Sequence, residues 1–485
     1  MAAITAPPEE IYLHSTLAYC VSCGKTELAR IMARESGVYM ERICTNSGMP
    51  SVKIAANPAW YRQRALSPRT INSSPGAIQH ISAMNEMKKG CPHDCGLCQW
   101  HTGKLHLPVF SITNDCNLDC PICFTYNRPD KKYYKTIDDT KKIIGHFLKN
   151  RKSVELINLT GGEPSLHPQL FELLAACKNQ GIKRITMNTN GLMIANNIEF
   201  AERIKAAGVQ IVLSLDTLDP AKSRVIHGRD ITREKQKCLK HLEAFDIPTT
   251  ILPVCIKGCN ETDVAEIVNN YIQKPFVRSI TIQNMTYTGK NGEQFLPHDH
   301  ITIDEVETLL CTHGKIKPDD FFAPASYHPL CYSAAYFIVH DGEIISLSDV
   351  LGQKALKEMS EDAYILNPNR DYSEEFRGGI NRLWAEGLSN KKLEILRTFL
   401  RAAYPPGTAI TEKERGEVLE QWIKMILIHA HMDAHNFDIA RVSSCGDLVP
   451  DEEGRMIPAC SYNLLYRRED VRFWAEQTNE APDVK

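Results

Sequence analysis

The chain shows no excess of charge of either sign. Among its 485 residues, 56 are Lys or Arg and 59 are Asp or Glu, which gives a formal net charge of −3. No global field therefore favours broad binding to nucleic acid or to an anionic membrane surface. We expect no nucleic-acid partner.

Long apolar runs are also absent. No stretch approaches the roughly 18 uninterrupted apolar residues of a membrane-spanning helix. The start, MAAITAPPEEIYLHS, lacks the basic stretch and apolar run of a secretory signal. We expect a cytoplasmic protein without a transmembrane segment. A helix expected at about 411–432 contains the apolar run WIKMILIHAHM; this stripe could touch a lipid, but we interpret it as packed in the core.

Cysteine, in contrast, is abundant, with 17 residues. Cytosolic thiols stay reduced, so dense cysteine in such a chain indicates metal binding rather than disulfides. Many of the cysteines also lie at short spacing, in the segments CVSC, CPHDCGLC and CNLDCPIC. Such clustering is typical of metal sites and is not needed by a packed core.

The pattern from residue 107 onward predicts an α/β fold. Apolar runs typical of strands occur at 107–113, 154–160, 184–190, 209–215, 249–255 and 279–286, with helical patterns between them. This alternation predicts a parallel sheet with right-handed crossovers. Six units are fewer than the eight of a closed TIM barrel, so we expect a partial (β/α)6 barrel.

Three sections of the chain follow from this pattern. We expect a cysteine-rich N-terminal module at 1–106, which includes the polar stretch 67–76. The partial TIM barrel is predicted at 107–290, and an α-rich C-terminal extension at 291–485 follows a polar linker at 287–300. In this extension, Asp341-Gly342 predicts the turn of a hairpin.

The first predicted strand of the barrel leads directly into a three-cysteine motif, Cys116-x-x-x-Cys120-x-x-Cys123. Three thiolates can bind three irons of a [4Fe–4S] cubane and leave the fourth iron without a protein ligand. An open metal position is typical of a reactive site, whereas a closed ligand set is structural or carries electrons. An isolated motif of this kind also fits a zinc knot, so the surrounding sequence has to decide.

A second motif, Thr160-Gly161-Gly162-Glu163-Pro164, follows the second predicted strand. Together the two motifs resemble those of radical S-adenosylmethionine (SAM) enzymes. The resemblance implies that Cys116, Cys120 and Cys123 bind a [4Fe–4S] cluster, and that the second motif holds the amino group of SAM. In this chemistry an electron from the cluster cleaves SAM to methionine and a 5′-deoxyadenosyl radical, which abstracts hydrogen from an unactivated carbon.

Further polar residues lie where ligands bind in such folds, at the carboxyl ends of the third and fourth predicted strands. By resemblance, Ser214 and Asp216 are candidates for the SAM ribose or carboxylate, and a structural turn role is the alternative. Asn188 lies at the same edge. The expected SAM-binding residues are Ile122, Gly161, Gly162, Glu163, Pro164, Asn190, Ser214 and Asp216. No catalytic residue can be named.

The remaining cysteines predict further metal sites. Cys91, Cys95 and Cys98 repeat the three-cysteine spacing, which favours an auxiliary [4Fe–4S] cluster over zinc, with Cys331 as the expected fourth ligand. The N-terminal knuckle Cys20, Cys23 and Cys44 could hold mononuclear iron or zinc. Cys445 and Cys460, with Cys311 or Cys259, could hold a third cluster or be unpaired thiols. Cys177 and Cys238 are interpreted as core residues.

The order of these motifs along nearly the whole chain resembles one branch of radical SAM enzymes, tetraether synthase and the archaeal pterin methylases. The resemblance rests on Lys89-Gly90-Cys91, Thr113-Asn114, Leu159 to Pro168 and Ile457 to Asn463. It implies several iron–sulfur clusters and carbon–carbon bond formation. One departure is Ser47, which stands where those relatives often have histidine. Serine is a poor ligand for a soft site, so the N-terminal metal is held differently or is absent.

We therefore expect a radical SAM enzyme that forms a carbon–carbon bond, by methyl transfer of the pterin type or by alkyl coupling of the tetraether type. It would take a small-molecule or lipid substrate and an external electron donor such as flavodoxin or ferredoxin. The alternatives are a radical SAM maturase that modifies a peptide or sugar, and a multi-cluster electron carrier. A corrinoid cofactor is disfavoured because the chain has no Asp-x-His-x-x-Gly segment.

Overall fold

The computed structural model describes residues 10–66, 88–96, 98, 100–103, 105–125, 131–148, 156–291, 295, 300–325, 327–360, 366, 368–451, 454–470 and 472. The polar stretch 67–76 lies outside the described residues, as does part of the linker predicted at 287–300. Within the described part of the chain, no helix is long and apolar enough to cross a membrane.

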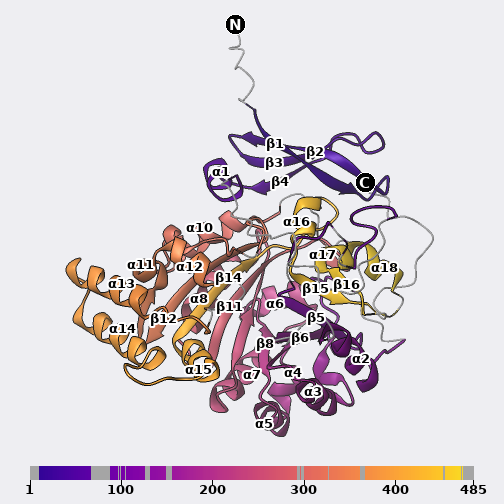
Figure 1. The fold of residues 1–485 in the computed structure, drawn as a ribbon. Helices are drawn as coiled ribbons and strands as arrows, with labels where there is room; N and C mark the ends of the chain where they lie inside the picture. The colour runs from indigo at the N-terminus through magenta and orange to yellow at the C-terminus, as the bar shows by residue number, and fades with distance from the viewer. Residues whose placement is uncertain are drawn as a thin grey trace.

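Four antiparallel strands form a separate layer near the N-terminus (Figure 1). They are β1 (Ile11–Cys20), β2 (Lys25–Arg34), β3 (Gly37–Arg42) and β4 (Ser51–Ala55), followed by α1 (Pro58–Ala65). Ile31, Met40 and Tyr61 are among the side chains that form the small core of this layer. Asn57 caps α1 by accepting hydrogen bonds from the N–H groups of Ala59 and Trp60.

The main sheet has twelve strands in the order β13-β12-β14-β11-β9-β8-β7-β6-β5-β15-β16, with β10 paired to β11. Its parallel part contains β5 (Leu107–Thr113), β6 (Leu156–Gly161), β7 (Arg184–Thr189), β8 (Gln210–Ser214), β9 (Thr249–Leu252), β10 (Val254–Cys255), β11 (Val277–Asn284) and β14 (Ile423–His429). The hairpin β12 (Tyr332–His340) and β13 (Glu343–Ser346) extends one edge; β15 (Asp447–Pro450) and β16 (Met456–Pro458) extend the other.

This arrangement is the α/β fold that the strand and helix pattern predicts. No pairing between described strands joins the two edges of the sheet, so it is an open mixed sheet and not a closed barrel. The partial (β/α)6 barrel is therefore confirmed only as an α/β sheet with helices.

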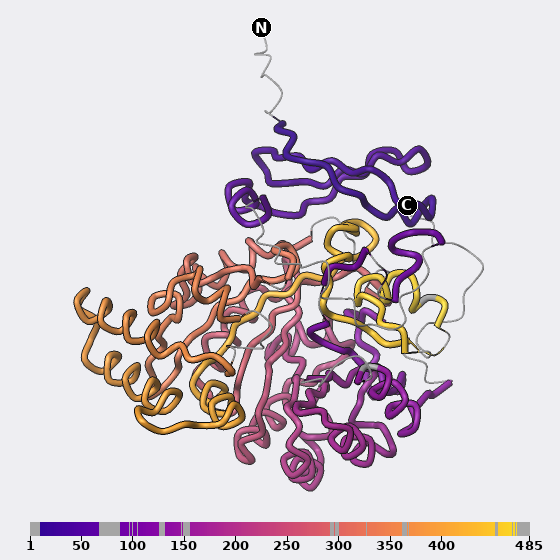
Figure 2. Tube along the Cα trace, viewed as in Figure 1, coloured from indigo at the N-terminus to yellow at the C-terminus, as the bar shows by residue number. Residues whose placement is uncertain are grey.

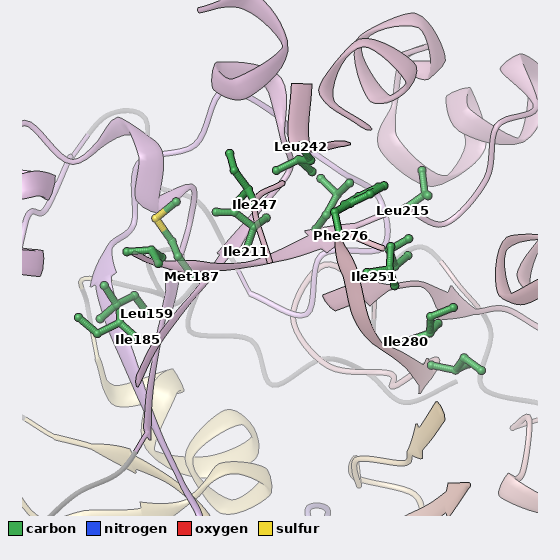
Figure 3. Close-up of a cluster of buried hydrophobic side chains, with 14 of the residues drawn as sticks. Leu159, Ile185, Met187, Ile211, Leu215, Leu242, Ile247, Ile251, Phe276 and Ile280 are labelled. Carbon is green, nitrogen blue, oxygen red and sulfur yellow. The ribbon is translucent and has the colours of Figure 1, made fainter. Parts of the chain in front are cut away.

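Helices follow the strands of the parallel part. They are α2 (Ile137–Leu148), α3 (Leu170–Asn179), α4 (Leu192–Asn196), α5 (Ile198–Ala206), α6 (Pro220–His227), α7 (Thr232–Ala244) and α8 (Glu261–Tyr271), with the short turn η1 (Pro164–Leu166) after β6. In Figure 1, α2, α3, α5 and α7 line the outer side of the sheet. Figure 3 shows apolar side chains of this core, with Ile211 of β8 and Leu242 of α7 among those labelled.

The other face of the same strands carries polar side chains. Asn158 donates hydrogen bonds to Thr186 Oγ1 and Asn188 Oδ1 on the neighbouring strand, each at 2.8 Å. Thr250 and Ser279 share a further hydrogen bond of 2.7 Å between their hydroxyls. Because neighbouring residues of a strand point to opposite faces, one sequence builds both an apolar core and a hydrogen-bonded polar face.

A second helical layer covers the β12–β13 hairpin. It contains α11 (Leu347–Leu351), α12 (Gln353–Met359), α13 (Ser373–Ala385), α14 (Asn390–Ala403) and α15 (Glu412–Trp422), with the turn η2 (Pro318–Asp320). The helix α10 (Ile303–His313) packs instead in the main core through Ile303, Val306 and Leu310. The chain then returns to the N-terminal layer and to β5, as Figure 2 shows, through α16 (Ile439–Ser443), α17 (Ala459–Ser461), η3 (Tyr462–Tyr466) and α18 (Arg467–Glu469). The hairpin turn predicted at Asp341-Gly342 is confirmed, since both residues have positive φ.

The long helix expected at 411–432 is wrong in its second half. Residues 412–422 form α15, but Ile423–His429 form the strand β14. β14 lies between β11 and β12, where Ile423, Met425, Ile426 and Ile428 are buried. A continuous apolar run with β-branched residues suits a strand covered on both faces, and periodicity alone does not distinguish it from a buried helix.

Candidate functional site

The motif with Cys116, Cys120 and Cys123 forms the loop that leaves the carboxyl end of β5. Burial raises the pKa of the Cys116 thiol to about 12 and also raises the pKa of Cys120, and the charges of the motif's thiols raise both further. The thiols of Cys116 and Cys120 therefore lie in a space that disfavours free thiolates. A positively charged metal group in this space would be needed to hold them deprotonated.

The two glycines after β6 let this segment pack against the cysteine loop. A Cβ atom on Gly161 would lie 2.1 Å from the carbonyl oxygen of Thr113, and one on Gly162 would lie 2.2 Å from that of Asp115. The N–H groups of Gly162 and Glu163 donate hydrogen bonds of 2.7 Å to the same two carbonyl oxygens. The close approach that requires glycine is thus made by the chain's own backbone.

Glu163 is buried and connects this turn to the end of β7. Its carboxylate accepts hydrogen bonds from the N–H of Ser165 at 3.0 Å, from Thr189 Oγ1 at 2.7 Å and from the N–H of Asn190 at 2.7 Å. Asn190 in turn donates to Asn117 Oδ1 of the cysteine loop at 2.7 Å. The expected residues Gly161, Gly162, Glu163 and Asn190 are therefore held in one network beside the three cysteines. Pro164 begins η1 directly behind them.

Lys235 is a residue of this network that the sequence reasoning missed. It is buried on α7, and its Nζ donates to the backbone oxygens of Asn190 at 2.7 Å and Ser214 at 2.5 Å. Burial lowers its pKa, and its charge lowers that of Cys120. A signal was present, because Lys235 shares a helix face with the buried Cys238, Leu239 and Leu242.

Asp216 and His227 form a second buried group beside the cysteine loop. Asp216 Oδ1 accepts a hydrogen bond of 2.7 Å from the N–H of Val254, and Oδ2 lies 3.5 Å from His227 Nε2. His227 Nδ1 lies 3.8 Å from Cys120 Sγ. Burial raises the pKa of Asp216 to about 6 and lowers that of His227 to about 3. Asp216 therefore holds β10 in place through the N–H of Val254, and it orients His227 toward Cys120.

Ile122 packs in an apolar group between the cysteine loop and the ends of β10 and β11. The group also contains Ile226, Ile256 and Met285, with Cys120, Cys259 and Tyr287 partly buried against it. A Cβ on Gly289 would lie 2.4 Å from the backbone carbon of Phe124, so the segment after β11 lies directly on the loop. The neighbourhood of the three cysteines is thus built by segments far apart in sequence.

The N-terminal cysteines come together at the turn between β1 and β2. The sulfur atoms of Cys20, Cys23 and Cys44 all lie within 4.8 Å of one another. Such spacing suits one tetrahedral ion, whose thiolates lie about 2.3 Å from the metal. Ser47 Oγ lies 3.6 Å from Cys20 Sγ, and hydrogen bonds from Ser47 and Asn46 lower the pKa of Cys44 to about 6. Ser47 therefore lies beside the trio as a hydrogen-bonding group.

Cys91, Cys95 and Cys98 lie together against the C-terminal segment. The hydrogen bond between the thiols of Cys91 and Cys95 raises the pKa of Cys91 and lowers that of Cys95. Tyr466 of η3 accepts a hydrogen bond of 2.9 Å from the N–H of Cys95 and donates one to His93 O at 2.6 Å. This group is therefore held in place by residues near the end of the chain.

Cys331 lies with Cys445 and Cys460, which the sequence reasoning did not foresee. Burial raises the pKa of all three thiols, and the charge of Cys331 contributes to the shifts of the other two. Arg441 Nε donates to Cys331 Sγ at 3.2 Å, and His431 Nδ1 lies 3.6 Å from Cys460 Sγ. Cys331 precedes β12, Cys445 precedes β15 and Cys460 follows β16, so the group joins segments that belong to opposite edges of the main sheet.

Cys311, expected in this last group, lies on α10. Its pKa is raised to about 11 by burial, and its charged neighbours are Glu307 and Asp320. The cysteine that lies beside Cys445 and Cys460 is therefore Cys331 and not Cys311. Cys177 and Cys238 are fully buried in the main core.

Comparison with known proteins identifies the class. Residues 110–270 match the model of the radical SAM superfamily. This segment, which runs from β5 through the cysteine loop and the glycine turn to α8, is a radical SAM domain. The class defined by such a domain is the radical SAM enzyme, and it implies a [4Fe–4S] cluster and SAM as cofactors.

Among individual relatives, 7,8-dihydro-6-hydroxymethylpterin dimethyltransferase of Methanocaldococcus jannaschii is 26% identical, with 94% of each chain covered. A probable GTP 3′,8-cyclase of Methanococcus maripaludis is 35% identical over 31% of this chain and 54% of its own length. A crystal structure of SuiB from Streptococcus suis bound to S-adenosylmethionine is 24% identical, with a TM-score of 0.33, over 38% of this chain and 41% of SuiB. The resemblance to the pterin branch thus extends over nearly the whole chain.

Proposed function

We propose that this chain cleaves SAM reductively and uses the resulting 5′-deoxyadenosyl radical to form a carbon–carbon bond on a pterin-like small molecule by methyl transfer. The observation that carries this proposal is the similarity to the archaeal pterin dimethyltransferase, which spans 94% of both chains. Local motifs alone do not distinguish among radical SAM reactions. A match that includes the N-terminal layer and the C-terminal extension favours a shared reaction type.

We assign the cluster that cleaves SAM to Cys116, Cys120 and Cys123. The loop offers three partly buried thiols and no fourth cysteine of the same motif, which fits a cubane with one open iron. When bound, this cluster supplies the electron that cleaves SAM. The chain's own part is to exclude water around the thiols and to hold the loop against the glycine turn.

The SAM-binding residues lie beside that loop at the carboxyl edge of the sheet. Glu163 holds the backbone of Asn190, and Lys235 holds the backbones of Asn190 and Ser214. The side chain of Asn190 is partly accessible to solvent, whereas Glu163 and Asp216 are buried and engaged internally. We infer that Asn190, Ser214 and Ile122 touch SAM, and that Glu163 and Asp216 position the segments that do.

The other cysteine groups fit two auxiliary clusters and one mononuclear ion. We assign one auxiliary cluster to Cys91, Cys95 and Cys98. A second is assigned to Cys331, Cys445 and Cys460, in place of the set with Cys311. Cys20, Cys23 and Cys44 suit a single iron or zinc. An external donor such as flavodoxin or ferredoxin would deliver the electrons that these groups pass on.

The proposal is tested with the reconstituted enzyme under anaerobic conditions. Purified protein with full iron and sulfide content is incubated with reductant, SAM, 7,8-dihydro-6-hydroxymethylpterin and a cell extract that supplies methyl donors, and the pterin is analysed by mass spectrometry. We expect a product heavier by one or two methyl groups, together with 5′-deoxyadenosine. The Cys116→Ala variant is the matched control and should give neither.

Lipid and peptide reactions are distinguished in the same experiment. If 5′-deoxyadenosine forms while the pterin mass stays unchanged in the presence of a cell extract that supplies methyl donors, methyl transfer to this substrate is refuted. Extracts of cells with and without the gene then separate the alternatives. Lipid chains joined with loss of two hydrogens indicate alkyl coupling.

A further inference from the structure

The C-terminal end of α6 lies directly against the cysteine loop. The N–H of Ile122 donates a hydrogen bond of 3.4 Å to the carbonyl oxygen of Ile226, and the two side chains pack together. Gly228 ends the helix, and a Cβ on it would lie 3.5 Å from the carbonyl oxygen of Asp119. His227 lies between these two contacts in the chain. Its backbone is therefore fixed relative to the loop.

The His227 side chain is only 4% exposed, and its two ring nitrogens lie near different groups. Nδ1 lies 3.8 Å from Cys120 Sγ, and Nε2 lies 3.5 Å from Asp216 Oδ2. Asp216 is itself held in place, because Oδ1 accepts a hydrogen bond of 2.7 Å from the N–H of Val254 and its backbone oxygen accepts one of 2.9 Å from the Asn260 amide. The ring therefore connects an anchored carboxyl group to one thiol of the loop.

Cluster binding fixes the direction of a hydrogen bond between the ring and the sulfur. A cysteine that binds iron does so as a thiolate, which carries no proton. A hydrogen bond between Nδ1 and this sulfur then has the N–H of the ring as its donor. The separation of 3.8 Å is within reach of a sulfur acceptor, which is larger than oxygen. The ring is buried, so water cannot take its place as donor without a change in packing.

We propose that His227 donates its Nδ1–H to the Cys120 thiolate of the bound cluster and thereby raises the reduction potential of this cluster, with Asp216 positioning the ring. Reduction adds negative charge to the cluster, and a hydrogen bond to a ligand sulfur stabilises that charge. The low effective dielectric constant of a buried site strengthens this effect. The proposal rests on the proposed function, which assigns the cluster to Cys116, Cys120 and Cys123.

The reduction potential is measured by EPR-monitored titration of the whole anaerobically reconstituted chain. The signal of this cluster is identified as the one that is missing in Cys116→Ala. At the midpoint potential of the wild type, we expect the ratio of reduced to oxidised cluster to be about tenfold lower in His227→Leu, which is a downward shift of about 59 mV for one electron. His313→Leu, at an exposed position of α10, is the control and should titrate as the wild type does.

Two amide variants separate the hydrogen bond from the filling of space by the ring. The amide nitrogen of Asn can take the place of Nδ1, whereas the longer Gln places its amide near the position of Nε2. We therefore expect His227→Asn to recover most of the wild-type potential and His227→Gln to titrate as His227→Leu does. A ring that only fills space would give one potential for all three variants and overturn the proposal. Equal iron and sulfide content verifies that the variants are loaded alike.

A double-mutant cycle tests the role of Asp216. Asp216→Ala removes the group beside Nε2 and should lower the potential in the wild-type background. In the His227→Leu background the same change should cause little further shift, because Asp216 acts through the ring. A purely structural role of Asp216 would instead add its own shift in both backgrounds.

Pulsed EPR of the reduced cluster without SAM gives a second readout. A strongly coupled nitrogen nucleus that disappears in His227→Leu would show that the ring binds iron itself, which overturns the proposal. We expect at most the weak coupling of a nitrogen that lies outside the cluster ligands.

The two proposals fail differently. A signal of this cluster that is present in His227→Leu at an unchanged potential overturns the role of His227 and leaves the cluster site intact. Absence of any signal that depends on Cys116 overturns the proposed cluster site, and the role of His227 with it. Neither result depends on whether the pterin is methylated.

Discussion

Gly162→Ala is the substitution that tests most directly how the glycine turn packs against the cysteine loop. The Cβ of Ala would lie 2.2 Å from the carbonyl oxygen of Asp115 and 2.9 Å from the carbonyl carbon of Asn114. Both contacts are with backbone, so no side-chain rotation relieves them. The turn has to move away from the cysteine loop by roughly 1 Å to restore an ordinary contact distance.

This movement also weakens the hydrogen bonds from Gly162 N–H to Thr113 O and from Glu163 N–H to Asp115 O. Each backbone hydrogen bond contributes about 1 kcal/mol net, and overpacking costs about 1–3 kcal/mol. We therefore expect a loss of about 2–4 kcal/mol in the free energy of unfolding. The displaced turn should also weaken SAM binding, because Glu163 would no longer hold the backbone of Asn190 in place.

The assay compares thermal unfolding and SAM binding of anaerobically purified Gly162→Ala with those of Gly145→Ala. A Cβ on Gly145, in the interior of α2, meets no atom within 4 Å, so this control should be stabilised by about 0.5–1 kcal/mol. Gly162→Ala should unfold several degrees below the wild type. Equal stability of both variants and unchanged SAM affinity would refute the reasoning.

Three further predictions concern the rest of the molecule. Burial lowers the pKa of Lys424 on β14 to about 7, whereas in the unfolded chain this amine keeps its proton up to about pH 10. The unfolded state therefore binds more protons between pH 7 and pH 10, and the free energy of unfolding should rise over this range. Lys424→Met should flatten this rise in denaturant titrations. Glu307 accepts hydrogen bonds from Arg64 at 2.8 Å and Trp60 at 2.7 Å. Glu307→Ala removes the carboxylate partner of the largely buried Arg64 and should lower the free energy of unfolding by about 3–5 kcal/mol. Proteolysis should then release the N-terminal layer faster, whereas Glu305→Ala should have a smaller effect. Ser47→Cys adds a thiol beside Cys20, Cys23 and Cys44 and should slow loss of zinc to a chelator, an effect that Ser36→Cys should not reproduce.

The parts of the fold that the sequence predicted best are those with local signals. The first strand of the barrel, predicted at 107–113, is β5, and the hairpin turn at Asp341-Gly342 occurs as expected. β14 was missed because its apolar run lacks the alternation of a half-buried strand. Its position between β11 and β12 depends on pairings between residues far apart in the chain, which no local pattern contains.

The candidate site likewise combines features that have a local sequence signal with features that depend on the folded chain. Motifs with short spacing, such as Cys116 to Cys123, can be recognised because their cysteines come from one loop. Cys331 lies with Cys445 and Cys460 although β12 and β15 belong to opposite edges of the sheet, and the spacing of these residues offers no hint of it. His227 and Cys120 are far apart in sequence, yet Nδ1 lies 3.8 Å from Sγ. Only the folded chain shows that the ring and the thiol form one group.

The central claim is that the loop with Cys116, Cys120 and Cys123 binds the cluster that cleaves SAM. The most direct measurement is 5′-deoxyadenosine formation by anaerobically reconstituted protein with reductant and SAM, compared with the triple Cys→Ala variant of this loop. Cys311→Ala is the control, because this thiol lies apart from the loop on α10. We predict turnover in the wild type and the control and none in the triple variant. 5′-deoxyadenosine formation by the triple variant at the wild-type rate would contradict the account.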